Sequence, residues 1–399
     1  MDRSSECCCE LGDGPNHPLI LTPTVAPVVP PHDAPDHRVD LPPTVRLVVL
    51  FGGRSPEHDV SRASAREVIA ALDPERYEIT PIGIGRDGTW MIAQDVTRIL
   101  AGPGALALPA SLSISGPHVD PAPVLAPAAG AAPLVVLPIL HGPNGEDGTM
   151  QGLLELADVP YVGSGVLGSA LAMDKAKAKE ILSHAGVPQA AYEIAAEWEL
   201  DPERLDAIID HLVFPIFVKP SNMGSSVGVS RAVDRAGLDL AVTTALQHDE
   251  WIVFEEAIVG RELEIGVLGS TAPHTSVIGE IVPGADFYDY DDKYVDGRAE
   301  MIIPADLPGA VAAEMSRLAV IAFTALRGEI LGRADFFYAA GDRGLVFNEL
   351  NTLPGCTPVS MFPSLWAASG LAYPQLMDEL VRLALERHAR RSRHGRRAL

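Results

Sequence analysis

Two short segments in the second half of the chain carry oxygen-bearing side chains at strand spacing. Asp335 lies in one predicted strand, and Glu349 and Asn351 lie two residues apart at the end of the next. Alternate residues of a strand share a face, so a hairpin of these two strands sets all three side chains together. Two carboxylates and an amide oxygen suit a Mg²⁺ ion that bridges nucleotide phosphates. The alternative, a solvated polar strand face, is weakened by the phenylalanines that flank these positions.

The chain has only five lysines, and three of them lie in segments suited to nucleotide phosphates. Lys219 precedes the loop 224–228, whose glycines let backbone N–H groups approach phosphate oxygens closely. Lys175 opens a predicted helix, and Lys293 lies in a polar aromatic loop. The glycine loop matches neither the P-loop pattern nor the dinucleotide fingerprint. We therefore expect a nucleotide that several separate segments hold.

Other candidate residues have ordinary interpretations beside the functional ones. The segment 255–258 looks like a strand exit, where backbone groups fit an adenine edge and a carboxylate fits a ribose; the alternative is surface charge. His141 is either catalytic or a hydrogen-bonded loop histidine. Lys177 and Lys179 are interpreted as solvated helix positions, and Cys356 is assigned no catalytic role.

The elements that must position these residues alternate between strands and helices, which implies a parallel sheet with ligand loops at the carboxyl ends of its strands. Apolar runs predict strands at 45–51, 77–84, 134–140, 214–219, 251–255, 262–268, 276–282, 333–339 and 344–350. Helical spacing follows residue 60 and recurs at 169–185, 309–326 and 373–388. The Ala/Pro/Gly-rich stretch 94–133 is interpreted as a variable excursion.

Composition narrows the class of protein. A chain of 399 residues with 47% hydrophobic content predicts two or three globular domains. The net charge of −23 argues against a nucleic-acid partner, and neither a membrane-spanning run nor a secretory signal is evident. Three adjacent cysteines near the start form no disulfide pattern, which fits a reducing cytoplasm. Residues 1–43 are predicted to be a disordered extension, and the basic tail 389–399 a solvated, frayed helix end.

The order of eight motifs resembles the ATP-grasp superfamily and, more narrowly, the D-alanine–D-alanine ligase family. These motifs are Phe51–Ser61, His141–Gly148, Met173–Lys175, Lys219–Gly228, Gly260–Glu262, Phe287–Tyr294, Gly332–Asp335 and Asn348–Gly355. The resemblance implies a mixed α/β and α+β fold. A Rossmann-like N-terminal substrate domain (45–163) would precede a two-domain ATP-grasp fold, with a central domain (164–254) and a C-terminal metal-binding domain (255–388).

The resemblance also implies an activity: ATP-dependent ligation of two D-alanines through a D-alanyl phosphate, for peptidoglycan precursor synthesis in the cytoplasm. ATP and two Mg²⁺ ions, with Mn²⁺ as a substitute, would be required, and the chain would form a homodimer with no nucleic-acid or membrane partner. Two alternatives stay open. One is a ligase of the same class that takes D-lactate or D-serine as second substrate, although Tyr294 argues against D-lactate. The other is a non-catalytic ATP-binding module, although no motif residue is lost.

Each matching residue takes a role from the resemblance. ATP would be bound through its phosphates, base and ribose by Lys175, Lys219, Gly224, Ser226, Glu255, Glu262 and Lys293. The metal ions would be held by Asp335, Glu349 and Asn351.

The two amino-acid sites are implied in the same way. Glu57 would bind the ammonium group of the first D-alanine and form a hydrogen-bonded triad with Ser225 and Tyr294. His141 would assist proton removal from the second D-alanine. The oxyanion site and the second carboxylate would be served by Arg333, the N–H of Gly355, Ser360 and Met361.

Overall fold

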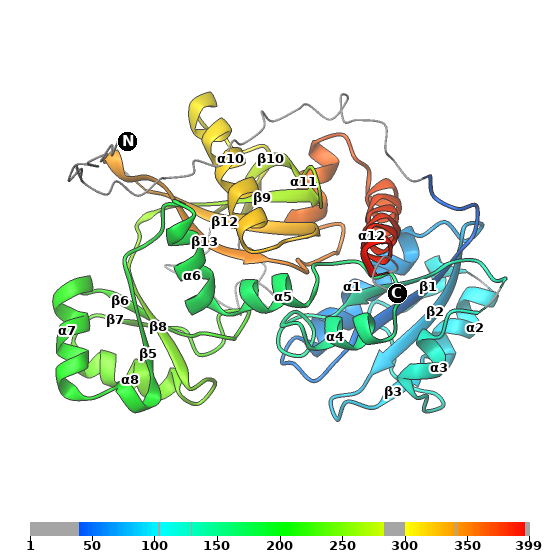
Figure 1. Ribbon diagram of the computed structural model, residues 1–399, viewed down its shortest axis with the longest axis horizontal. Helices are drawn as coiled ribbons and strands as arrows, with labels where there is room; N and C mark the ends of the chain where they lie inside the picture. Colours follow the sequence, from blue (N-terminus) through cyan, green and yellow to red (C-terminus); the bar gives the residue numbers. More distant parts are fainter. Residues whose placement is uncertain (1–39, 103, 129, 283–299, 340, 396–399) are drawn as a thin grey trace, which may run out of the picture. The chain divides into compact units, whose positions relative to one another are not determined.

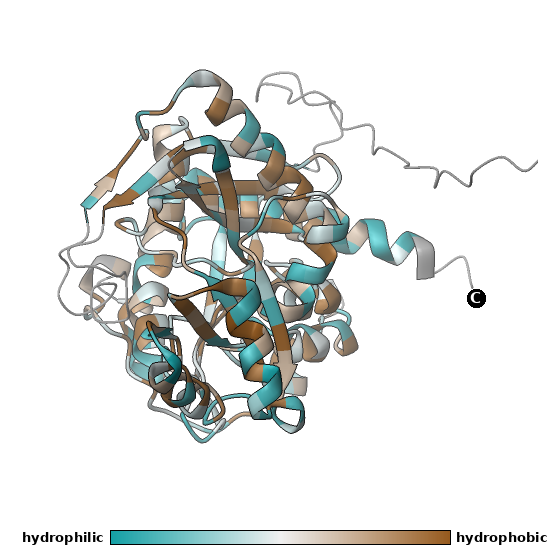
Figure 2. Ribbon diagram, turned by 90° about the vertical axis from the view of Figure 1, so that its left-hand side faces the viewer, coloured by the Kyte–Doolittle hydropathy of each residue, from teal (hydrophilic) through white to brown (hydrophobic). Residues whose placement is uncertain are grey.

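The computed structural model describes residues 40–282 and 300–395, except residues 103, 129 and 340 (Figure 1). Residues 1–39 of the predicted extension and the motif Phe287–Tyr294 lie outside the described residues. The described residues form three sheets. No helix among them is long and apolar enough to cross a membrane. In Figure 2 the hydrophobic colours run along the strands, whereas the C-terminal end of the last helix is hydrophilic.

The first sheet has the order β3-β2-β1-β4. Its strands are β1 (Val45–Gly52), β2 (Tyr77–Ile84), β3 (Trp90–Ile92) and β4 (Leu134–Ile139). β1 lies parallel to β2 and β4, as the alternating pattern predicts, and only β3 is antiparallel. The apolar run of β1 is almost entirely buried. Helix α1 (His58–Ala71) begins directly after Glu57, so that carboxylate lies at the carboxyl-end edge of the sheet.

The stretch 94–133, interpreted as a variable excursion, contains helices and contributes to the core at a few positions. It contains α2 (Gln94–Ala101) and α3 (Pro121–Leu125), and Leu112 is fully buried in the core of the first sheet. Ile114 fills the space above Gly83, where a Cβ atom would lie 2.8 Å from its side chain. The alanine- and proline-rich composition of the segment gives no sign of these few core contacts. They form only because the segment packs on the first sheet.

The second sheet has the order β5-β8-β6-β7 and is entirely antiparallel. Its strands are β5 (Tyr192–Ala196), β6 (Ile216–Pro220), β7 (Ser230–Ala232) and β8 (Trp251–Glu256), and its helices are α7 (Pro202–Leu212) and α8 (Arg235–Ala245). Apolar side chains of both helices join the strands in one core, which includes Ile208, Leu238 and Phe254. The glycine loop therefore leaves β6 from a rigid base.

The single helix predicted over 169–185 is two helices in the structure. α4 (Thr149–Leu156) precedes α5 (Val166–Met173), and α6 (Lys175–His184) follows after a break at Asp174. Asp174 has an extended backbone, and its side chain accepts a hydrogen bond from Lys177 N at 3.0 Å. That is an N-cap, which favours starting a new helix here. Lys175 N donates to Ser221 O at 3.0 Å, so the break ties Lys175 to the end of β6.

The third sheet has the order β11-β10-β9-β12-β13. Its strands are β9 (Gly260–Gly269), β10 (His274–Val282), β11 (Glu300–Ile302), β12 (Ile330–Ala339) and β13 (Gly344–Asn351). Helix α10 (Gly309–Ala325) packs on the face that carries Leu263 and Ile265. Helix α11 (Met361–Ala368) covers the other face, where Gly266 leaves room for Trp366.

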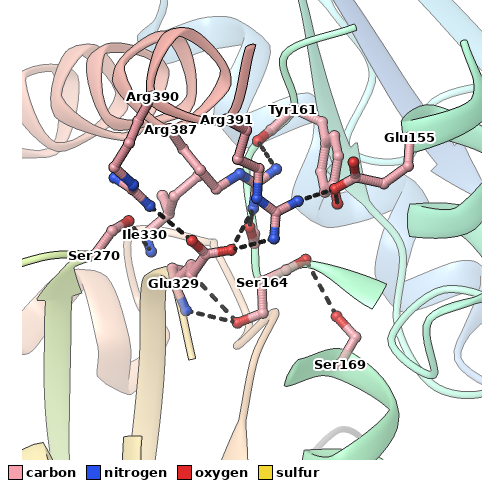
Figure 3. A network of polar contacts seen from close by, with 11 residues as sticks. Glu155, Tyr161, Ser164, Ser169, Ser270, Glu329, Ile330, Arg387, Arg390 and Arg391 are labelled. Atoms are coloured by element: carbon pink, nitrogen blue, oxygen red, sulfur yellow. Dashed lines mark hydrogen bonds and ion pairs between the residues drawn. The ribbon is translucent and has the colours of Figure 1, made fainter. Parts of the chain in front are cut away.

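The described part of the predicted tail, residues 389–395, continues the last helix, and two of its arginines make ion pairs with the rest of the fold. Helix α12 runs over Tyr373–Gly395, beyond the predicted end at 388. Figure 3 shows three of its arginines around Glu329, which lies just before β12. Nη2 of Arg390 and Nη2 of Arg391 lie 2.8 and 3.0 Å from the Glu329 carboxylate. Arg387 stacks 4.0 Å from the ring centre of Tyr161 and donates to the Tyr161 carbonyl at 3.1 Å.

This cluster leads to a stability prediction. Glu329→Ala removes the carboxylate shared by buried Arg387 and the more exposed Arg390 and Arg391. Breaking a buried ion pair from one side costs about 3 kcal/mol at most for such a partly exposed cluster. We expect the urea concentration at the midpoint of unfolding to be lower for Glu329→Ala than for the wild type. Glu314→Ala is the matched control, since Glu314 pairs with Arg317 on the exposed face of α10 and such pairs contribute less than about 1 kcal/mol. Equal shifts in the two variants would contradict the assignment of α12 to the core.

Candidate active site

The contact between Glu57 and Ser225 joins the first sheet to the glycine loop. Ser225 Oγ donates a hydrogen bond to Glu57 Oε1 at 2.5 Å. Glu57 is buried, and a Cβ atom at Gly142 would lie 2.6 Å from its other oxygen, so only glycine fits at position 142. The structure thus brings together two members of the predicted triad. The third, Tyr294, lies outside the described residues.

His141 lies beside this contact, at the end of β4. Its Nδ1 lies 3.2 Å from the carbonyl oxygen of Leu353, and because a carbonyl can only accept, Nδ1 carries the proton. Nε2 is buried and has no hydrogen-bond partner among the described residues. Burial lowers the pKa of His141, with Glu57 opposing that effect. The imidazole is therefore neutral, with a lone pair on Nε2 that can accept a proton.

Glu146 is a site residue to which the sequence analysis gave no role. Its Oε2 accepts a hydrogen bond from Gly142 N at 2.7 Å. Burial, with the charge of Glu57 as the next cause, raises its pKa well above the ordinary value, and Glu349 adds to the effect. Glu146 lies in the motif that begins at His141, and this position in a motif could have marked it as a candidate site residue. The sequence does not show that the loop folds back beside Glu57.

The prediction that a hairpin brings Asp335, Glu349 and Asn351 together is confirmed. Asp335 pairs with Glu349, and Arg333 pairs with Asn351, across β12 and β13. Asn351 Nδ2 donates to Asp335 Oδ2 at 3.0 Å. Arg333 donates to both oxygens of Asp335 at 2.8 Å and lies 2.8 Å from the carboxylate of Glu264. Burial alone would lower the pKa of Arg333, but these carboxylates hold it well above the ordinary value.

The oxygen donors of the hairpin fit a hard divalent cation. No group of three or more His, Cys, Asp or Glu side chains in the described part of the chain is arranged to hold a metal ion. The predicted set differs, since it comprises two carboxylates and one amide. A further carboxylate, that of Glu264, lies beside this set and 2.8 Å from Arg333. Oxygen ligands with excess negative charge are what Mg²⁺ prefers.

The lysines gather on the other side of the site, around Glu255. Lys219 Nζ donates to Glu255 Oε2 at 3.0 Å, and Lys175 Nζ donates to the carbonyl of Met223, directly before the glycine loop. Lys177 is exposed and pairs with Glu180, as predicted. The prediction that Lys179 is solvated is wrong. It is buried, with Nζ 3.3 Å from Glu255 Oε1.

The remaining predicted residues lie in three places. Ser226 and Gly224 belong to the glycine loop, and Glu262 lies on β9, paired with Ile281. Gly355 precedes Ser360, whose Oγ lies 2.7 Å from Thr357 Oγ1. Met361 packs in a core cluster with Ile281. Lys293 lies outside the described residues.

Lysines gather around Glu255 near a glycine loop, that loop contacts Glu57 of the first sheet, and a hairpin brings Asp335, Glu349 and Asn351 together. This fold and site define the class of ATP-grasp ligases. Comparison with known proteins narrows the class. The family model described as D-ala D-ala ligase N-terminus matches residues 46–164, and the model described as D-ala D-ala ligase C-terminus matches residues 181–382. The chain belongs to the D-alanine–D-alanine ligase family.

Relatives and solved structures agree with that placement. The D-alanine–D-alanine ligase of Bacillus cytotoxicus is 47% identical over 355 residues, covering 86% of this chain and 96% of the relative. The D-alanine–D-alanine ligase structure from Coxiella burnetii has a TM-score of 0.73 at 31% identity, covering 89% of this chain and 98% of that one. The VanG D-Ala:D-Ser ligase of Enterococcus faecalis has a TM-score of 0.71 at 31% identity, covering 86% and 99%.

Proposed function

We propose that this chain joins two D-alanines to D-alanyl-D-alanine with cleavage of ATP, through a D-alanyl phosphate, in the synthesis of peptidoglycan precursors. The observation that carries the proposal is the hydrogen bond between buried Glu57 and Ser225 of the glycine loop, in a member of this family. The charges of Glu57 and Arg333 both act on His141. A carboxylate for an ammonium group, a neutral base and a fixed cation are the groups that amide formation needs.

In the first half-reaction the carboxylate of the first D-alanine attacks the γ-phosphorus of ATP. Lys175 and Lys219 bind the phosphates, and Glu255 and Glu262 bind the base and ribose. Asp335, Glu349 and Asn351 would hold two Mg²⁺ ions, which supply positive charge between the reacting anions. Mn²⁺ would substitute. Lysine suits the phosphate positions because its compact ammonium group acts as a point charge.

In the second half-reaction the amine of the second D-alanine attacks the acyl carbon, a C–N bond forms, and the bond to phosphate breaks. Glu57 keeps the first ammonium group in place. His141 Nε2 takes the proton of the attacking amine, which its neutral state and open lone pair support. Arg333 and the N–H of Gly355 stabilise the tetrahedral oxyanion.

Binding of the second substrate and of the γ-phosphate completes the proposal. Ser360 and Met361 contact the carboxylate of the second D-alanine. Lys293 binds the γ-phosphate, and Tyr294 completes the triad with Glu57 and Ser225. We assign the substrate domain to residues 45–163, the central domain to 164–254 and the metal-binding domain to 255–388. We further propose a cytoplasmic homodimer.

The test is phosphate release from ATP and Mg²⁺ with and without D-alanine. Release should depend on D-alanine and should yield one phosphate per dipeptide. Hydrolysis at the same rate without D-alanine would instead support an ATP-binding module that is not a ligase. Offering D-serine or D-lactate together with D-alanine identifies the second substrate, and D-alanine should be preferred over both.

A further inference from the structure

Lys179 is buried at the nucleotide side of the site without a role in the proposed reaction. It lies one helical turn after Lys175 on α6, and only 3% of the residue is exposed. Its Nζ lies 5.3 Å from the ring centre of Tyr192 and makes no hydrogen bond to any described residue. Burying a lysine is costly unless another charge compensates it. The compensating charge here is Glu255, 3.3 Å away.

Glu255 is held between two ammonium groups. Lys219 binds Oε2 at 3.0 Å, and Lys179 lies against Oε1. Burial by itself would raise the pKa of Glu255, but the charges of Lys179 and Lys219 outweigh it and lower the pKa to about 2. Glu255 is therefore a carboxylate at neutral pH. An ionised carboxylate accepts hydrogen bonds and donates none.

The two lysines differ in what they can reach. The Lys219 side chain is 15% exposed and lies at the start of the glycine loop, where the phosphates of ATP would share it. Lys179 is enclosed by Tyr192 and Glu255, whose positions are fixed because they pair across β5 and β8. When the phosphates of a bound nucleotide interact with Lys219, Lys179 is the cation that remains paired with Glu255.

We propose that Lys179 is a positioning residue that makes the site select a purine with a 6-amino group, because it keeps the Glu255 carboxylate ionised and oriented toward the base. This inference rests on the proposed function, in which Glu255 binds the base. The 6-amino group of adenine donates to a carboxylate, whereas a 6-oxo purine presents an acceptor. Two acceptors facing each other in a buried place lose a hydrogen bond and repel.

The test compares ATP with inosine triphosphate, which differs at the 6-position of the purine. In Lys179→Met the ratio of kcat/KM for ATP over inosine triphosphate should fall about tenfold or more, the worth of one buried hydrogen bond to a charged group. KM for ATP should rise while KM for D-alanine stays unchanged, which a general structural defect would not produce. Lys179→Arg should keep most of the selectivity. Lys177→Met is the matched control, because Lys177 lies on the same helix and is exposed.

A second pair of variants asks whether Lys179 acts through Glu255. Glu255→Gln should lose selectivity, and adding Lys179→Met to it should change the ratio no further. This pair also decides the matter if Lys179→Met alone does not fold, since the double variant buries no uncompensated charge. An unchanged ratio in Lys179→Met, or a further fall in the double variant, would overturn the inference. Wild-type protein without D-alanine-dependent phosphate release would overturn the proposed function instead.

Discussion

Replacing Arg333 by methionine is expected to lower kcat for dipeptide formation by about a thousandfold, the loss that follows removal of an oxyanion-stabilising donor. The guanidinium is rigidly held, because Asp335 binds it through both oxygens and Glu264 lies against Nε. A donor fixed before the reaction needs no reorganisation when charge develops on the acyl oxygen. Arg333→Lys keeps the charge but loses the two-pronged geometry, so we expect an intermediate loss of about ten- to a hundredfold.

The measurement separates the two half-reactions in a single turnover by following ADP and dipeptide together. Dipeptide formation should slow much more than ADP formation, since the oxyanion develops only after the acyl phosphate exists. Arg317→Met controls for loss of an arginine, because Arg317 pairs only with Glu314 on the surface among the ion pairs of the described residues. Equal slowing of ADP and dipeptide formation would show that Arg333 acts on phosphoryl transfer or folding instead.

Local sequence pattern predicted the elements whose signals are themselves local. The strand from Val45 and the pairing of Asp335 with Glu349 follow from apolar runs and a period of two. The break at Asp174 was predicted only in part. Helical spacing continues across it over 169–185, whereas the prediction that Lys175 opens a helix agrees with the start of α6. Lys179 was misinterpreted for a related reason. A lysine in a polar helix is ordinarily solvated, and its burial depends on a glutamate 76 positions later that β8 brings beside it.

The arginines near the end of α12 were also misinterpreted because their partner is distant in sequence. A run of arginines at a terminus is typically a solvated helix end, and composition offers nothing against that reading. Glu329 changes this interpretation, because its side chain, just before β12, accepts hydrogen bonds from Arg390 and Arg391. In both places a carboxylate far away in sequence decides where a cation lies. Motif order identified the family, while pairwise electrostatics at long range had to come from the structure.

The second large effect is expected at the first D-alanine site. Glu57→Gln keeps the shape of the side chain and removes its charge, and loss of one partner from a buried charge pair costs enough to raise KM for the first D-alanine about a hundredfold. Glu57 is only 7% exposed, so water screens the ammonium–carboxylate attraction weakly. Ser225→Ala removes only the hydrogen bond to Glu57 and should raise the same KM by about tenfold.

Single-turnover ADP formation at increasing D-alanine reports on the first site, because in the proposed sequence the second D-alanine reacts only after phosphoryl transfer. Asp59→Asn is a matched control, since Asp59 lies two residues later on α1 and pairs with Arg62 and Arg86 at the surface. The control should keep the wild-type KM, and KM for ATP should be unchanged in all three variants. A rise in KM for ATP equal to that for D-alanine would mean that Glu57 supports the fold of the glycine loop through Ser225 rather than binding the ammonium group.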